Sequence, residues 1–98
     1  MFVVLWMFEA KPGWEDEFLR AYGADGQWAQ LFRRSPGYLQ TELIRDAEMA
    51  RRFVTIDRWA SRQAFEEFKV AWKADYDALD ARCRQLTKSE RLLGHFET

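Results

Sequence analysis

The sequence predicts an α+β fold of the ferredoxin-like βαββαβ type, with a four-stranded antiparallel sheet that carries its helices on one face. Two observations predict it. Segments with strand and helix periodicity follow one another in the order β, α, β, β, α, β. The chain has 98 residues, the size of one domain, and no linker, repeat or low-complexity stretch divides it. We therefore expect a single domain over residues 1–98.

Residues 2–8 are an apolar run rich in β-branched and aromatic side chains, and the breakers Lys11-Pro12-Gly13 follow it. This pattern predicts the first strand. Both alternating sets of its side chains are apolar, so both faces of the strand need to be buried. Helices cover only one face of such a sheet, and a second copy of the chain is the simplest cover for the other. The sequence thus predicts a homodimer.

Residues 14–32 have helical periodicity in two parts. Trp14, Phe18 and Tyr22 lie on one face at steps of four, which predicts the first helix. A glycine-containing break at residues 23–26 follows, where Asp25 can cap a second, short helix. The apolar side of this second helix is Trp28, Leu31 and Phe32. Ser35-Pro36-Gly37 ends the helical region, because the residue before a proline avoids the α conformation.

Two further strands are predicted over Tyr38–Arg45 and Arg52–Trp59. The first alternates apolar and polar side chains, as a strand with one solvated face does. The polar link at residues 46–51 is short, so the two strands should form an antiparallel hairpin.

The longest helical segment begins after Ser61, a suitable N-cap. Its apolar stripe continues at steps of three and four, which predicts one long helix. The stripe consists of Phe65, Phe68, Trp72, Tyr76, Leu79, Cys83 and Leu86. Residues 87–90 have capping-box spacing and predict a short helical turn. Leu92–Phe96 is then expected to be the last strand.

The composition excludes several functions. Acidic and basic residues are interspersed and the net charge is −1, so neither nucleic acid nor an anionic membrane is an expected partner. The apolar start is too short to span a bilayer. Cys83 is the only cysteine, which excludes an internal disulfide and favours the cytoplasm. One histidine and one cysteine cannot form a metal cluster, and glycine-rich nucleotide loops are absent. We therefore expect no metal and no cofactor.

Three short motifs carry a resemblance to a known family. They are Lys11-Pro12-Gly13, the Ser-Pro-Gly-Tyr sequence at 35–38, and the segment from Asp57 to Phe65. Together they resemble the antibiotic biosynthesis monooxygenase family of small dimeric α/β barrels, over nearly the whole chain. The resemblance implies this barrel as the form of the dimer. Members include quinone-forming monooxygenases that act on polycyclic phenols without metal or flavin, and haem-degrading enzymes.

The haem-degrading members use an Asn on the first strand, with a Trp and a His on the long helix. The positions of this sequence that match them hold Trp6, Phe68 and Ala78. Ala78 cannot ligate iron, so the resemblance does not extend to haem degradation.

The quinone-forming members use an Asn and a Trp on the third strand and a Tyr early in the long helix. The matching residues are Thr55, Trp59 and Phe65, so only the Trp is retained. The resemblance implies a cofactor-independent monooxygenase acting on an aromatic, hydrophobic small molecule. The two lost positions leave open the alternative of a non-catalytic dimeric ligand-binding or structural protein.

The candidate catalytic residues are Thr55, Asp57 and Trp59, which alternate onto one face of the predicted strand 52–59. Asp57 could be a general base of raised pKa or the partner of an arginine. Trp59 could act on the substrate or anchor the core. His95 is expected at the surface or an interface, and acid–base work is its alternative.

Aromatic side chains are the candidate substrate-binding residues, because flat hydrophobic ligands bind in aromatic-walled pockets. The set is Tyr22, Trp28, Phe65, Trp72 and Tyr76. Core packing is the alternative for each of them. We expect a cavity between sheet and helices, reached near Tyr22, Trp28, Trp59 and Trp72.

Overall fold

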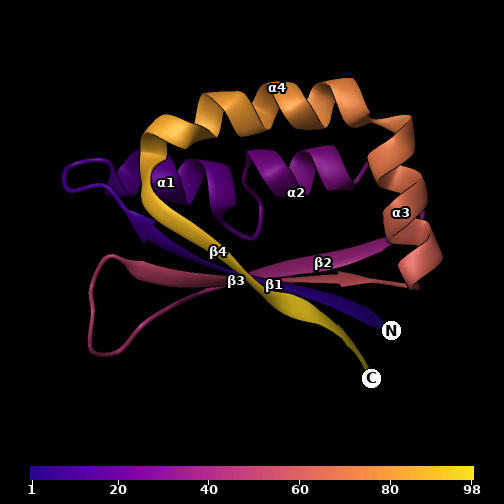
Figure 1. Ribbon diagram of the computed structural model, residues 1–98, viewed down its shortest axis with the longest axis horizontal. Helices are drawn as coiled ribbons and strands as arrows, with labels where there is room; N and C mark the ends of the chain where they lie inside the picture. The colour runs from indigo at the N-terminus through magenta and orange to yellow at the C-terminus, as the bar shows by residue number, and fades with distance from the viewer.

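A four-stranded antiparallel sheet with strand order β2-β3-β1-β4 forms one layer of the structure, and the helices form the other (Figure 1). The computed structural model describes all residues from Met1 to Thr98. The elements in chain order are β1 (Phe2–Ala10), α1 (Glu15–Tyr22), α2 (Gln27–Phe32), β2 (Tyr38–Arg45), β3 (Arg52–Trp59), α3 (Arg62–Ala71), α4 (Lys73–Cys83), the 3-10 turn η1 (Arg84–Leu86) and β4 (Thr87–Glu97). The predicted ferredoxin-like α+β fold is confirmed.

Strand β1 lies in the centre of the sheet, as its apolar sequence predicts. It pairs antiparallel with β3, with Phe2 opposite Trp59 and Phe8 opposite Phe53, and with β4 on its other edge. The turn after β1 uses Gly13 at φ +85°, a left-handed conformation that glycine adopts without steric cost. Strand β2 pairs with β3 as the predicted hairpin.

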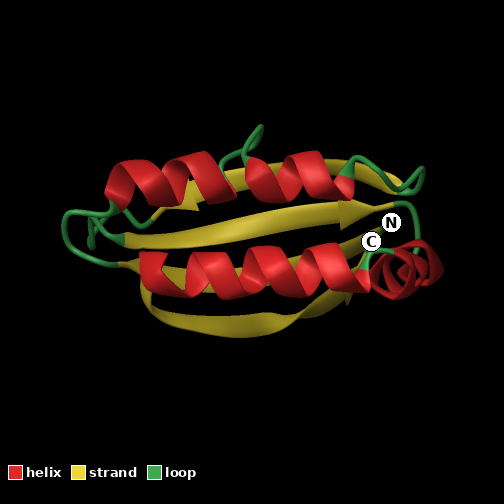
Figure 2. Cartoon of the chain, turned by 90° about the horizontal axis from the view of Figure 1, so that it is seen from above, coloured by secondary structure: helices red, strands yellow, loops and turns green.

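The helices cover a single face of the sheet. Seen from above, α1 and α2 lie end to end in one row, α4 lies alongside them, and α3 stands at the end of the layer (Figure 2). None of the helices combines the length and apolar character needed to cross a bilayer. The second face of the sheet carries no helix.

The predicted single long helix is wrong, because the chain turns sharply at Trp72 between α3 and α4 (Figure 1). Trp72 has φ −114° and ψ 26°, outside the helical range. The bend follows from packing. Phe68 of α3 packs on Phe32 and on Trp59 at the end of the sheet, whereas Tyr76 of α4 packs on Trp28 of α2. One straight helix could not make both sets of contacts.

The predicted last strand and the helical turn before it also need correction. β4 begins at Thr87 rather than Leu92, and the turn that precedes it is η1, upstream of residues 87–90. Pairing with β1 explains the difference, because Glu90 lies opposite Phe8 and Thr87 opposite Ala10. The ladder with β1 therefore outweighs the local capping-box signal.

The core is a cluster of aromatic side chains between the sheet and the helices. Trp59, Phe2, Phe18 and Phe68 are its largest fully buried side chains. Aromatic rings in such tilted and edge-to-face arrangements contribute beyond their buried area. The aromatic excess of the sequence thus serves packing first.

Candidate active site

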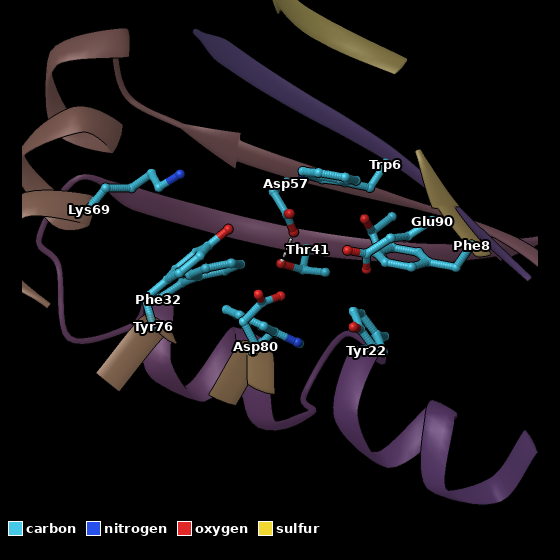
Figure 3. A pocket seen from close by; sticks show the side chains of 12 residues that line it. Trp6, Phe8, Tyr22, Phe32, Thr41, Asp57, Lys69, Tyr76, Asp80 and Glu90 are labelled. Carbon is cyan, nitrogen blue, oxygen red and sulfur yellow. Dashed lines mark hydrogen bonds between the residues drawn. The ribbon is translucent and has the colours of Figure 1, made fainter. Parts of the chain in front are cut away.

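A cavity of about 260 Å³ lies between the sheet and the helices (Figure 3). Side chains on the inner faces of both layers form it. Alternation along β1 and β3 turns Trp6 and Thr55 toward the helices. Its aromatic walls are Trp6 and Phe8 from β1, Tyr22 from α1, Trp28 and Phe32 from α2, and Tyr76 from α4. The polar groups on the lining are Thr41, Thr55, Asp57, Lys69, Asp80 and Glu90.

Asp57 is the most deeply buried charged group of the cavity. Its side chain comes from β3 and is 7% exposed. Thr41 Oγ1, opposite it on β2, donates a hydrogen bond of 2.6 Å to Asp57 Oδ1, and the Tyr38 hydroxyl donates to Thr41 Oγ1 at 2.8 Å. Burial raises the pKa of Asp57 to about 6, and the hydrogen bond from Thr41 opposes that rise.

Asp57 forms no ion pair, so the arginine-paired alternative is wrong. The neighbouring Arg58 points to the other face of the sheet and pairs with Glu42. A buried carboxyl without a cation keeps its elevated pKa, and it can therefore exchange a proton near neutral pH.

The tyrosines of the cavity stay protonated. Burial raises the pKa of Tyr76 to about 12, and burial also raises the pKa of Tyr22 well above its usual value. Their hydroxyl groups can therefore donate hydrogen bonds to an anionic oxygen but cannot act as bases. The indole Nε1 of Trp28 is buried near Tyr22 and Cys83.

The lining also holds three charged groups that are less buried than Asp57. Asp80 of α4 pairs with Arg84 at 3.6 Å. Burial, with the neighbouring Asp80, raises the pKa of Glu90 on β4. Lys69 of α3 is the one cation on the lining.

Five of the eight predicted site residues line the cavity, namely Thr55, Asp57, Tyr22, Trp28 and Tyr76. Trp59, Phe65 and Trp72 do not. Trp59 is 0% exposed and is packed against Phe32, Tyr38, Phe65 and Phe68, so it anchors the core. Its Nε1 is buried without a hydrogen-bond partner.

The prediction that the cavity is reached near Trp59 and Trp72 is wrong, because neither residue lines it. Phe65 packs between Phe2, Trp59 and His95. Trp72 lies under the Arg34 guanidinium, whose Cζ is 5.0 Å from the ring centroid, and borders a separate pocket. Phe65 and Trp72 therefore pack against the core and do not line the cavity.

Several lining residues were missed from the sequence. Trp6 and Phe8 share their strand face with Phe2, so the alternation along β1 could have identified them. Thr41 could have been found from the register of the hairpin, which sets it opposite Asp57. Lys69, Asp80 and Glu90 could not, because their positions depend on the bend at Trp72 and on the early start of β4.

Comparison with known proteins identifies relatives. The family model of antibiotic biosynthesis monooxygenase matches residues 1–70. The cofactor-independent oxygenase SnoaB from Streptomyces nogalater is similar in structure, with a TM-score of 0.73 and 20% identity over 99% of this chain and 91% of SnoaB. A candidate antibiotic biosynthesis monooxygenase from Deinococcus radiodurans has a TM-score of 0.76 and 17% identity, over 100% of this chain and 92% of its own.

These structural likenesses, at such identities, show a shared fold. Comparison with curated protein sequences gives no match. The family model, in contrast, is a match of sequence and covers 70 of the 98 residues. The chain belongs to the antibiotic biosynthesis monooxygenase family.

Proposed function

We propose that this protein is a cofactor-independent monooxygenase-like enzyme that oxidises an aromatic, hydrophobic small molecule in the cavity. The observation that carries the proposal is Asp57, a buried carboxyl of pKa about 6 in an aromatic-walled cavity. A general base works best when its pKa lies near the operating pH. Membership of the family supports the reaction type, and the similar fold of SnoaB, a cofactor-independent oxygenase, agrees with it.

The proposed reaction converts a phenol to a quinone with O₂ as the only co-substrate. The phenol proton passes to Asp57, and a ring carbon of the phenolate reacts with O₂ to form a peroxide anion, which takes the proton back from Asp57 and becomes a hydroperoxide. The hydroperoxide loses water together with the hydrogen of the same carbon, which leaves a quinone. One oxygen atom enters the product and the other leaves as water. The substrate supplies the electrons, so the reaction is balanced without an external reductant.

The residues of the cavity divide the work. Thr41 occupies Asp57 Oδ1, which leaves Oδ2 for the substrate hydroxyl. The Tyr22 and Tyr76 hydroxyls are donors that can stabilise the phenolate oxygen. Thr55 takes the position at which the quinone-forming relatives carry Asn and offers a hydroxyl in its place.

Oxygen uptake with a hydroxynaphthalene tests the proposal. Wild-type protein should consume O₂, and Asp57→Asn should lower the rate at least about a hundredfold, the usual contribution of a positioned general base. Asp16→Asn is the matched control, because Asp16 lies on the exposed side of α1 away from the cavity. A rate in Asp57→Asn equal to that of the control would contradict the proposal.

A second candidate function is ligand binding without catalysis. It is favoured by Thr55 and Phe65, which stand where the quinone-forming relatives carry Asn and Tyr. A ligand that binds without any O₂ consumption would support this alternative.

We further propose that the chain works as one unit over residues 1–98, in the cytoplasm, as a homodimer. The sheet face without helices, which we name the open face, carries Val3, Leu5, Met7, Val54 and Ile56. An apolar face of this kind favours association with a second copy. The single cysteine favours a reducing compartment.

A further inference from the structure

Lys69 is the only cation on the cavity lining, and no carboxylate lies within 4.0 Å of its ammonium group. The Nζ atom lies 4.7 Å from the ring centroid of Tyr76 and 5.6 Å from that of Phe65. These cation–π contacts hold the ammonium at the cavity without neutralising its charge. Figure 3 shows the Lys69 amine at one side of the cavity, away from Glu90.

Two other lysines of the chain are paired with carboxylates. Lys73, four residues further along, contacts Asp77 at 2.6 Å, and Lys88 contacts Glu9 at 3.7 Å. Lys69 instead faces the cavity with its charge available to a ligand.

Among the carboxylates of the lining, Glu90 lies at the end away from Lys69, whereas Asp57 and Asp80 lie between the two (Figure 3). Glu90 is opposite Phe8 in the β4–β1 ladder, whereas Lys69 lies over Phe65, whose ring packs on Phe2. Phe2 and Phe8 are six residues apart on β1, which separates them by about 20 Å at the rise of an extended strand. Figure 3 shows Lys69 and Glu90 on opposite sides of Asp57. The cavity is therefore polarised along its length.

We propose that the ligand of this cavity is an aromatic hydroxy acid whose carboxylate binds Lys69. Glu90 repels a carboxylate from the opposite end, so Lys69 and Glu90 together fix the orientation of the ligand. The ring system then spans the aromatic walls, and its hydroxyl lies against Asp57. The position of that hydroxyl rests on the proposed function, whereas the binding of the carboxylate by Lys69 does not.

The expected effect is moderate. Lys69 is exposed at the cavity opening, where water and salt screen an ion pair. Such a pair changes affinity by about fivefold. The effect should shrink as the salt concentration rises.

Quenching of tryptophan fluorescence in oxygen-free buffer tests the inference. The probes are a hydroxynaphthoic acid and the uncharged hydroxynaphthamide of the same substitution pattern. Wild-type protein should bind the acid about fivefold more tightly than the amide. Lys69→Gln should remove this preference, Lys69→Arg should retain it, and the control Lys73→Gln should leave it unchanged.

Equal affinity of the two probes in wild-type protein would overturn the inference, and so would a preference that persists in Lys69→Gln. Tighter binding of a naphthylmethylammonium ion than of the acid would also overturn it, since the carboxylates would then dominate. Unchanged thermal unfolding of Lys69→Gln verifies that the variant is folded. Because no turnover is needed, Lys69-dependent binding without O₂ uptake would reject the proposed function alone. Uptake without acid preference would reject this inference alone.

Discussion

Asp57 is the residue on which the chemical account depends. Most buried carboxylates are paired with a cation, because an unpaired charge in the interior is unfavourable. Asp57 has only the hydroxyl of Thr41, itself supported by Tyr38. Such an arrangement destabilises the ionised form in the free protein, which is the property that a proton acceptor needs.

The raised pKa of Asp57 should be measurable as a pH-dependent stability. Its pKa is about 6 in the folded protein against an ordinary value of 3.8. The folded state therefore binds the proton more tightly than the unfolded state. Its contribution to stability is full below about pH 4 and is lost as the pH rises through about 6. The loss amounts to about 2–3 kcal/mol.

Asp57→Asn isolates this effect, because the amide oxygen can still accept the Thr41 hydrogen bond and does not titrate. In chemical denaturation the variant should gain about 2–3 kcal/mol relative to wild type between pH 4 and pH 7. The Asp16→Asn control should show no such gain. A constant difference between Asp57→Asn and wild type across this range would show that the folded pKa of Asp57 is not raised.

The residue scale also shows what sequence patterns can and cannot identify. Thr55 and Asp57 were predictable as cavity residues, because strand alternation fixes their face and the strand itself was unambiguous. Trp59 shares that face yet lies in the core. Its role depends on the helix that covers the end of the strand, and alternation carries no information on which end is covered.

At the scale of elements, the strongly patterned segments were predictable and those shaped by packing were not. The Ser35-Pro36-Gly37 loop before β2 was predicted, but only the structure shows why it needs a glycine. A Cβ atom on Gly37 would clash with the Cβ of Ala64 in α3, so glycine lets α3 approach the start of β2. The same docking of α3 onto the sheet end requires the bend at Trp72, since α4 must then run back alongside α2 (Figure 2).

The bend at Trp72 connects element geometry to the site. Lys69 lies before the bend and Asp80 after it, and both line the cavity. In one straight helix, the directions of these two side chains would follow from their spacing in the sequence. The presence of Lys69 and Asp80 on one cavity lining thus arises from a feature that periodicity does not encode. For the same reason the candidate polar groups were only partly predictable.

At the scale of the whole molecule, the open face requires an explanation. Helices bury one face of the sheet, and the open face presents a row of apolar side chains on the two central strands. Neighbouring strands add exposed apolar groups, including Ile44 at 48% and Phe96 at 46% exposed. Pairing of two such faces would bury both sets at once and account for the doubly apolar sequence of β1.

The dimer gives a direct prediction. Wild-type protein should be dimeric at micromolar concentration, with a total buried area of roughly 1,500 Å² or more. Leu5→Glu places a charge in the centre of the open face and should yield a folded monomer. Val70→Glu is the matched control, because Val70 is 80% exposed on α3 and should leave the dimer intact. Light scattering measures both, and a monomeric wild type would refute the dimer.

The central claim is that Asp57 is the base that starts the oxygen chemistry, and the pH dependence of oxygen uptake tests it most directly. With a hydroxynaphthalene substrate, kcat/KM of the wild type should rise tenfold per pH unit below about pH 6 and level off above it, because only ionised Asp57 accepts the proton. The charged and titratable groups that face it are Tyr38, Tyr22, Tyr76, Lys69, Asp80 and Glu90. Of these, only Asp80 and Glu90 are carboxylic acids, and the variants Asp80→Asn and Glu90→Gln should retain the rise of kcat/KM with pH. A profile that is flat in the wild type, or that persists in Asp57→Asn, would contradict the account.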